Sequence, residues 1–145
     1  MSLSSFYTFP KGKGKESWKK EFIELVKSPN ITIKNGVITR LKYKNMDNQT
    51  HRNSYTGPAI INYSKNGEVF IVKYKFNGKL HRLPELGPAV IDYYKTGKIL
   101  SEQYYFKGKL HRSPESGFAE IWYYENGEIS YKQHWVYGKR VNQRK

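Results

Sequence analysis

The sequence predicts a mainly β protein: an elongated single antiparallel sheet of tandem β-hairpin repeats, preceded by one N-terminal helix. Three observations lead to this prediction. A phrase of thirty residues recurs three times without a gap, and a fixed period of this size is typical of repeat architectures. Apolar and polar residues alternate within each copy, as in half-buried strands. Tyrosine occurs 13 times in 145 residues, and its ring and hydroxyl suit the half-exposed face of a sheet.

The composition is basic and lacks cysteine. The chain has 26 Lys and Arg against 12 Asp and Glu, a formal net charge of +14, so its summed field attracts polyanions. The lack of cysteine favours a reducing, intracellular compartment, because small secreted domains usually depend on disulfides. No stretch approaches the roughly 20 apolar residues of a membrane-spanning helix, and the first ten residues lack a signal-peptide pattern. We expect an intracellular protein of one domain.

The N-terminal region is predicted to contain an arm and a helix. Residues 1–16 form a flexible basic arm, because glycine alternates with lysine towards its end. Residues 17–28 form an amphipathic helix that begins with Ser17 as N-cap. Pro29 ends it, since the residue before a proline avoids the helical region. The apolar face, expected to cover the sheet or to form a dimer contact, consists of Trp18, Phe22, Leu25 and Val26.

Residues 29–139 are predicted to hold the hairpin repeats, and residues 140–145 form a basic tail. A degenerate first copy covers about residues 31–50, and terminal repeats are commonly atypical. Within a copy, an alternating strand, a turn with glycine and a returning strand form a hairpin. The chain turns again at Lys107-Gly108, and a loop with glycine and proline then leads to the next copy. The complete copies begin at His51, His81 and His111.

The hairpin turns are predicted from the pairs Asn66-Gly67 and Asn126-Gly127. Both residue types tolerate a positive φ, which a two-residue hairpin turn requires at each position. Asn35-Gly36 in the degenerate copy aligns with the first pair. With one hairpin per copy, we expect roughly seven or eight antiparallel strands.

These copies resemble MORN-type repeats. The resemblance rests on residues 121–127 and 104–108, which set tyrosines beside turn glycines, and it covers about residues 31–140. The longer phrase from Gly-Lys-Leu-His-Arg to Gly-Pro-Ala is similar to a variant in large DNA viruses of amoebae and in some bacterial antitoxin-like proteins. The copies are longer than the common unit, and Phe118 replaces the proline of Gly-Pro-Ala. The resemblance implies an elongated sheet used as a scaffold for protein or lipid contacts, without catalytic residues.

The His-Arg pair that begins each copy is the first candidate site. Equivalent positions in successive hairpins lie two strands apart, about 9 to 10 Å, whereas zinc needs each nitrogen at about 2.0 to 2.1 Å. We therefore expect a structural or binding role in the repeat loop, and no metal, cofactor or catalytic residue. Either the pair bonds loop carbonyls, or the arginine pairs with the glutamate of its own copy. The residues are His51, Arg52, His81, Arg82, His111 and Arg112.

Lysines interleaved with tyrosines form the second candidate site. Exposed aromatic rings can stack on bases while lysines neutralise phosphates, as in proteins that bind single strands. The alternative is that the tyrosines pack across strands and the lysines form a solvated face. The candidate polyanion contacts are Lys42, Lys44, Lys73, Lys75, Lys132, Lys139, Arg140, Arg144 and Lys145.

The sequence favours a non-enzymatic scaffold or interaction protein. Its partner is expected to be another protein or a second copy in a homodimer, because one short helix cannot cover a sheet that is apolar on both faces. The viral resemblance implies a virion-associated structural role. The alternatives are a nucleic-acid-binding or packaging protein and an antitoxin-like binder of an acidic protein. No small-molecule substrate is expected, and the identity of the partner stays open.

Overall fold

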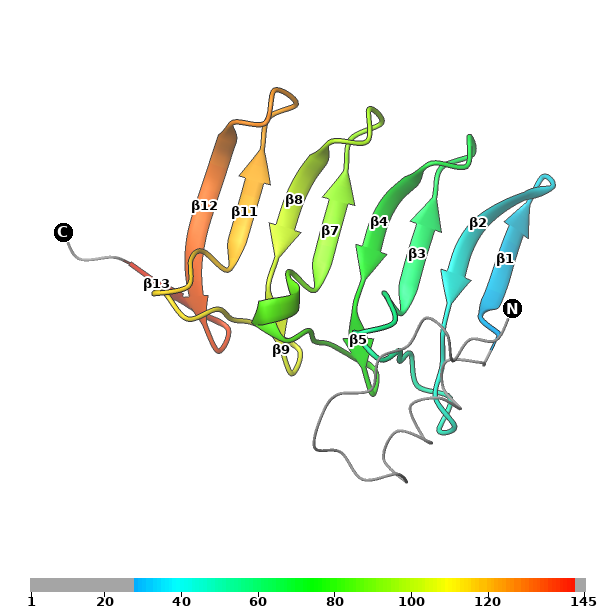
Figure 1. The fold of residues 1–145 in the computed structure, drawn as a ribbon, viewed down its shortest axis with the longest axis horizontal. Coiled ribbons are helices and arrows are strands. Elements are labelled where there is room, and N and C mark those ends of the chain that lie inside the picture. Colours follow the sequence, from blue (N-terminus) through cyan, green and yellow to red (C-terminus); the bar gives the residue numbers. More distant parts are fainter. Residues whose placement is uncertain (1–27, 143–145) are drawn as a thin grey trace.

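The computed structural model describes residues 28–142, which form an elongated row of antiparallel hairpins (Figure 1). The mainly β class and the hairpin order expected from the sequence are confirmed. The predicted arm and helix fall, apart from Ser28, outside the described residues. Nine strands form one sheet, in the order β1 (Asn30–Lys34), β2 (Val37–Lys42), β3 (Ile60–Tyr63), β4 (Val69–Lys73), β7 (Val90–Tyr93), β8 (Ile99–Gln103), β11 (Glu120–Tyr123), β12 (Ile129–Val136) and β13 (Lys139–Val141).

Two of the copies add a second, shorter hairpin below the long one. The pairs β5 (Lys75–Phe76) with β6 (Lys79–Leu80), and β9 (Tyr105–Phe106) with β10 (Lys109–Leu110), form two-stranded sheets of their own. The predictions of a single sheet and of seven or eight strands were therefore wrong, since the described residues contain thirteen strands. The reason is that the pairs Asn77-Gly78 and Lys107-Gly108 reverse the chain a second time within the thirty-residue period.

The two kinds of hairpin use different turns. In the short hairpin, Asn77 and Gly78 have φ values of 48° and 84°, as a two-residue turn requires. At the tip of the long hairpin only Gly67 has a positive φ, 83°, and its N–H donates to the Ser64 carbonyl at 2.9 Å. The register shifts beside this turn, so the tip is a longer turn followed by a bulge. The hairpins predicted at Asn66-Gly67 and Asn126-Gly127 are confirmed, but the positive φ expected at both residues of each pair occurs only at the glycine.

The degenerate first copy keeps the frame of the others. Its long hairpin β1–β2 turns at Asn35 and Gly36, which both have positive φ, 51° and 76°. Its short turn is one residue longer, and Asn48 takes the positive φ there. The frame is restored at His51, whose N–H donates to the Tyr43 carbonyl at 3.0 Å.

A buried alanine joins each hairpin to its neighbours. Ala89 has no exposed surface, and its N–H donates to the Gln103 carbonyl at 2.9 Å. Its own carbonyl accepts the N–H of Tyr74 at 2.7 Å. Ala59 and Ala119 are equally buried and make the equivalent bonds. A side chain larger than a methyl group would therefore separate adjacent copies.

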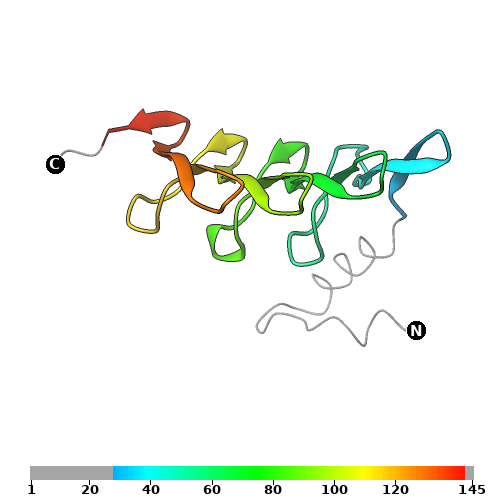
Figure 2. The same ribbon diagram turned by 90° about the horizontal axis from the view of Figure 1, so that it is seen from above.

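The connecting loops leave the sheet on one side at equal intervals (Figure 2). The second of them contains a 3₁₀ turn at Pro84–Leu86. In the described part of the chain, no helix has the length and apolarity that crossing a membrane requires.

Candidate interaction surfaces

The arginine of each His-Arg pair is held by its own connecting loop. The guanidinium carbon of Arg82 lies 3.8 Å from the ring centroid of Tyr74, and Nη1 donates to the Pro88 carbonyl at 3.0 Å. Arg52 and Arg112 make the same two contacts, at 4.0 Å from a tyrosine ring and at 3.2 and 3.1 Å from a loop carbonyl. The arginines therefore stabilise the loops rather than extend into solvent.

Each guanidinium lies against a glycine. Gly87 has a φ of 120° and a ψ of −171°, a region that only glycine occupies readily. A Cβ at this position would lie 2.9 Å from Arg82 Nη1. Glycine is thus required at this position for two reasons: its backbone conformation, and the space that the arginine fills.

The histidines lie in a column of aromatic rings beside the short hairpins. His81 accepts the backbone N–H of Lys107 at its Nδ1 atom, at 3.0 Å. Its ring centroid lies 4.9 Å from that of Phe106 and 6.0 Å from that of Phe76. Neighbouring rings lie 4.1 to 6.0 Å apart along the whole column, which consists of His51, Phe76, His81, Phe106, His111 and Tyr137.

These contacts give the histidines a structural role in the short hairpins. Burial, and then the charge of Lys107, lower the pKa of His81, which favours the neutral ring that accepts the backbone N–H. The same acceptor bond recurs from Asn77 to His51 and from Tyr137 to His111. Among the described residues, no group of three or more His, Cys, Asp or Glu side chains could hold a metal ion.

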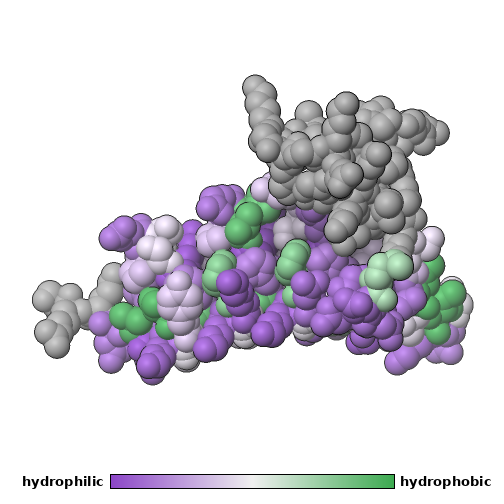
Figure 3. Space-filling model, turned by 90° about the horizontal axis from the view of Figure 1, so that it is seen from below, coloured by the Kyte–Doolittle hydropathy of each residue, from purple (hydrophilic) through white to green (hydrophobic). Residues whose placement is uncertain are grey.

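The lysines predicted to contact a polyanion do not form one site. Lys42 and Lys73 both pair in register with Ile60, one on each side. Burial lowers the pKa of Lys75, and the positive charges of Lys73 and Lys42 lower it further, so these three lysines form one cluster, which we call the lysine cluster. The end of the molecule that carries the short hairpins is predominantly hydrophilic (Figure 3).

The other predicted contacts lie elsewhere. Lys44 donates to the Asn48 side chain at 3.0 Å. Lys132 pairs with Ile121, and its Nζ atom lies 4.8 Å from the ring centroid of Phe118. Lys139 and Arg140 belong to the edge strand β13. Arg144 and Lys145, and the predicted helix residues Trp18, Phe22, Leu25 and Val26, lie outside the described residues.

Three similar grooves lie between the tips of neighbouring long hairpins. They share the sheet face that carries Tyr63, Tyr93 and Tyr123, which we call the tyrosine face. Each groove is lined by one of these tyrosines and by an apolar residue of the preceding hairpin, respectively Ile38, Val69 and Ile99. The groove volumes are about 430, 380 and 490 Å³ in chain order, and all three are open to solvent.

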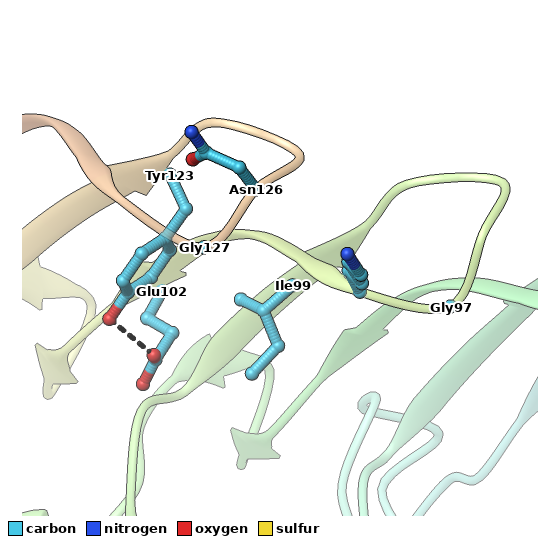
Figure 4. Close-up of a pocket in the computed structure, with 7 residues that line it drawn as sticks. Gly97, Ile99, Glu102, Tyr123, Asn126 and Gly127 are labelled. Atoms are coloured by element: carbon cyan, nitrogen blue, oxygen red, sulfur yellow. Dashed lines mark hydrogen bonds between the residues drawn. The ribbon is translucent and has the colours of Figure 1, made fainter.

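The third groove shows the chemistry of these sites most clearly (Figure 4). The hydroxyl of Tyr123 donates to Glu102 Oε1 at 2.8 Å. Burial, and then the bond to Glu102, raise the pKa of Tyr123 to about 12, so the phenol stays protonated at neutral pH. Ile99 contributes an apolar wall and Lys98 a positive charge. The groove can therefore hold an apolar group between polar neighbours.

The sequence interpretation missed the apolar column on this face. Ile38, Val69, Ile99 and Ile129 are 42%, 36%, 38% and 48% exposed. A signal was present, because each of them follows a turn glycine by two residues. Periodicity alone could not show that these residues line up in one column, or that no second layer of the described chain covers them.

The last copy departs from the repeat at two positions that touch each other. Phe118 replaces the loop proline, and His134 replaces the tyrosine that elsewhere receives an arginine. Their rings stack with centroids 4.0 Å apart and planes 27° apart. The position that would supply the next arginine is Asn142. The two substitutions therefore act as a pair that closes the C-terminal end of the array.

No family model matches the chain, and comparisons with curated proteins and with solved structures also find no match.

Proposed function

We propose that this chain is a non-enzymatic interaction protein, in which a MORN-like row of β-hairpins presents its three grooves to one extended protein segment. The observation that carries the proposal is the repetition of the grooves, each with a tyrosine and an exposed apolar residue at the same place in the hairpin. A partner that crosses the strands meets the same surface three times.

The spacing of the grooves selects the conformation of the partner. Equivalent positions lie two strands apart, about 9 to 10 Å. A polyproline II segment points every third side chain the same way and advances about 9.3 Å over those three residues. A β-strand alternates its side chains with a period of two, so the side chain three residues after one that enters a groove would point away from the next groove. The grooves therefore fit a polyproline II segment with apolar residues three apart.

The net charge of +14, rather than the lining of the grooves, adds a preference for acidic residues. Lys95 lines the second groove together with Glu68, and Lys98 lines the third together with Glu102, so the charges within each groove balance. Aromatic-lined grooves bind such preformed extended segments at low entropic cost. We expect a partner sequence with proline and leucine at the groove positions and aspartate or glutamate between them.

Synthetic peptides test this function directly. One labelled peptide carries leucine at positions i, i+3 and i+6 in a proline-rich background with acidic residues, and a second has the same composition with the leucines adjacent. Fluorescence anisotropy is expected to show tighter binding of the spaced peptide to the full chain. Ile99→Lys is expected to weaken that binding at least tenfold, through loss of apolar contact in the third groove.

The matched control is Tyr55→Lys, which changes a side chain that is 58% exposed in a connecting loop away from the grooves. It is expected to leave peptide affinity unchanged. Equal affinity for both peptides, equal effects of the two substitutions, or no binding of the spaced peptide at millimolar concentration would each refute the proposal.

The lysine cluster supports a second candidate function, binding of a single-stranded nucleic acid. Lys42, Lys73 and Lys75 are close enough that the first two lower the pKa of the third, so positive charge is concentrated there. Neutralising three phosphates with these lysines would give a salt dependence with a slope near −2 in a plot of log affinity against log salt, at about 0.7 per phosphate for single strands.

Charge-matched triple variants separate this site from general attraction. Replacing Lys42, Lys73 and Lys75 by glutamine is expected to reduce the salt slope for a labelled oligonucleotide by about 2. Replacing the exposed tip lysines Lys65, Lys95 and Lys98 by glutamine is expected to have a smaller effect. Equal losses in the two variants would show that only the net charge matters and would remove the cluster as a site.

A further inference from the structure

The first strand of the sheet is an open edge. Among residues 28–142, β1 pairs with β2 only, and all five of its residues are exposed. Ile31 and Ile33 are 53% and 62% exposed. An edge strand with free backbone groups and apolar side chains is a template for another strand.

The free backbone groups of this edge belong to Ile31 and Ile33. The N–H of Tyr43 bonds into the next hairpin, and bonded pairs alternate along antiparallel strands. The backbone N–H and C=O groups of Arg40 and Lys42 in β2 therefore point towards β1, where their partners are Thr32 and Asn30. Ile31, which lies between these two partners, and Ile33, which follows Thr32, therefore point their N–H and C=O groups away from the sheet edge into solvent.

We infer that β1 pairs with β1 of a second copy of this chain, antiparallel about a two-fold axis at Thr32. In this register Ile31 faces the second copy's Ile33, and the reciprocal pair forms across the axis. Both outward-facing residues then make both backbone hydrogen bonds. Asn30 faces the second copy's Lys34, so no two like charges oppose each other.

Neighbouring two-fold registers fail for local reasons. An axis at Ile31 would place Ile33 opposite Pro29, which has no N–H to donate. An axis at Ile33 would place Ile31 opposite Asn35, which has a φ of 51° within the turn. The register about Thr32 is therefore the one that uses every outward-facing group of β1.

The opposite edge of the sheet does not invite the same pairing. β13 has three residues, and its first two, Lys139 and Arg140, are exposed. An antiparallel pairing about its centre would oppose Arg140 with itself, and short charged edge strands resist association. The assembly therefore closes as a dimer instead of extending into a fibre.

The dimer also extends the tyrosine face. Ile31 pairs with Leu41 in β2, which pairs with Ile61 in β3, so all three side chains share this face. The four isoleucines of two β1 strands would join the apolar columns of both copies into one continuous strip.

A cysteine at the two-fold axis tests the register, because the chain contains no cysteine of its own. Thr32 would face its own counterpart in a non-hydrogen-bonded pair with Cα atoms about 4.5 Å apart, within the range of disulfides. Mild oxidation of Thr32→Cys is expected to yield a covalent dimer on non-reducing gels. Lys34→Cys and Arg140→Cys are the controls, and neither is expected to cross-link to the same extent.

Sedimentation velocity on the full chain tests the dimer itself. The unmodified chain is expected to sediment as a dimer at micromolar concentration, and Ile33→Pro as a monomer, because proline removes an outward N–H without affecting the bonds to β2. Far-UV circular dichroism checks that this variant is folded. Ile129→Lys, which changes an isoleucine that is 48% exposed and distant from β1, is the matched control and should remain dimeric.

Three results would overturn the inference. The first is an unmodified chain that stays monomeric over the whole concentration range. The second is a dimer that survives in folded Ile33→Pro. The third is a dimer in which Thr32→Cys cross-links no better than the two control cysteines.

Discussion

Arg82 shows how single residues hold a copy of the repeat together. The ring of Tyr74 covers its guanidinium, and the Pro88 carbonyl accepts a hydrogen bond from it. Gly87, which has no side chain, leaves the space that the guanidinium occupies. Cation–π contacts of this kind contribute about 0.5 to 2 kcal/mol, and the same arrangement occurs in each complete copy. Each connecting loop is therefore held by the arginine of its own copy, whose guanidinium lies on a tyrosine of the preceding copy.

Gly87→Ala is expected to destabilise the fold by about 1 to 3 kcal/mol. The added methyl group would occupy a strained backbone region and would displace the Arg82 guanidinium, 2.9 Å away. Urea denaturation followed by circular dichroism measures the change. Gly97→Ala is the control, since Gly97 also has a positive φ, 87°, but a Cβ there meets nothing within 4 Å. It carries backbone strain without the contact, so a loss as large as that in Gly87→Ala would contradict the steric argument.

The stability of the fold is expected to fall in mild acid through His81. Its pKa is lowered from the ordinary value of 6.5, first by burial and then by Lys107. The folded chain therefore binds a proton at His81 less readily than the unfolded chain does. The stability that neutral His81 contributes is fully present above pH 6.5 and is lost as the pH falls through the pKa of His81 in the folded chain.

Urea midpoints between about pH 8 and about pH 5 measure this dependence. His81→Gln keeps an acceptor for the Lys107 N–H but cannot titrate. It is expected to show a shallower loss of stability towards acid than the unmodified chain. Identical pH profiles for the two proteins would assign the acid sensitivity to other groups.

At the level of secondary structure, the two hairpins of a copy make different demands on their turns. In the complete copies the long hairpin needs one residue with positive φ, and glycine supplies it. The short hairpin needs two, and the first of them is Asn77 in one copy but Lys107 in the next, with φ values of 48° in both. A lysine in this conformation is strained, because only glycine, asparagine and aspartate adopt it readily.

Lys107→Asn is therefore expected to stabilise the protein by roughly 0.5 to 1 kcal/mol. The backbone bond from this residue to His81 is kept, because it does not involve the side chain. Thermal and urea unfolding measure the gain. The reverse exchange, Asn77→Lys, serves as the control and should lower stability by at least as much, because it also removes the hydrogen bond that Asn45 Nδ2 donates to Asn77 Oδ1 at 3.0 Å. A loss in Lys107→Asn would show that its side chain matters more than its φ.

The last copy shows a second principle at this level. Internal copies cover a tyrosine with the arginine of the following copy, whereas the position thirty residues after Arg112 is Asn142. Phe118 and His134 replace that contact with a stacked pair. The end of the array is thus closed by two substitutions that are far apart in the sequence and adjacent in the fold.

At the scale of the whole molecule, each hairpin contacts its neighbours and little else, as in other linear repeat proteins. The bonds of Ala89 to Gln103 and Tyr74 are typical of this arrangement. Stability is then approximately a sum over copies and their interfaces. An array of this kind tolerates loss of a complete copy better than loss of part of one.

Deletion of residues 81–110 is expected to yield a shorter folded protein. The deletion joins Leu80 to His111 and so recreates the Leu-His junction of the intact chain. The dependence of unfolding free energy on urea should fall with the lost surface. Circular dichroism and urea titration check this, with deletion of residues 81–95 as a control that breaks the period and is expected to prevent folding. An unfolded product from the first deletion would contradict the additive picture.

The sequence by itself determined the period, the β class and the positions at which the chain turns. These properties depend on neighbours in the chain: glycine where φ is positive, alternation of apolar residues, and thirty-residue recurrence. The sequence indicated the second turn, at Lys107-Gly108, but not the short strands paired on either side of such turns, because β5 and β6 have two residues each and no alternation can be read from so few.

Only the tertiary structure decided which recurrent residues face one another. The stacking of Arg82 on Tyr74, the separation of Lys132 from the lysine cluster, and the alignment of Ile38, Val69 and Ile99 beside the tyrosines all depend on register between strands. Register is set by contacts between residues far apart in the chain, and a shift of one residue would turn every side chain to the other face. For that reason the repeat could be read from the sequence, and its surfaces could not.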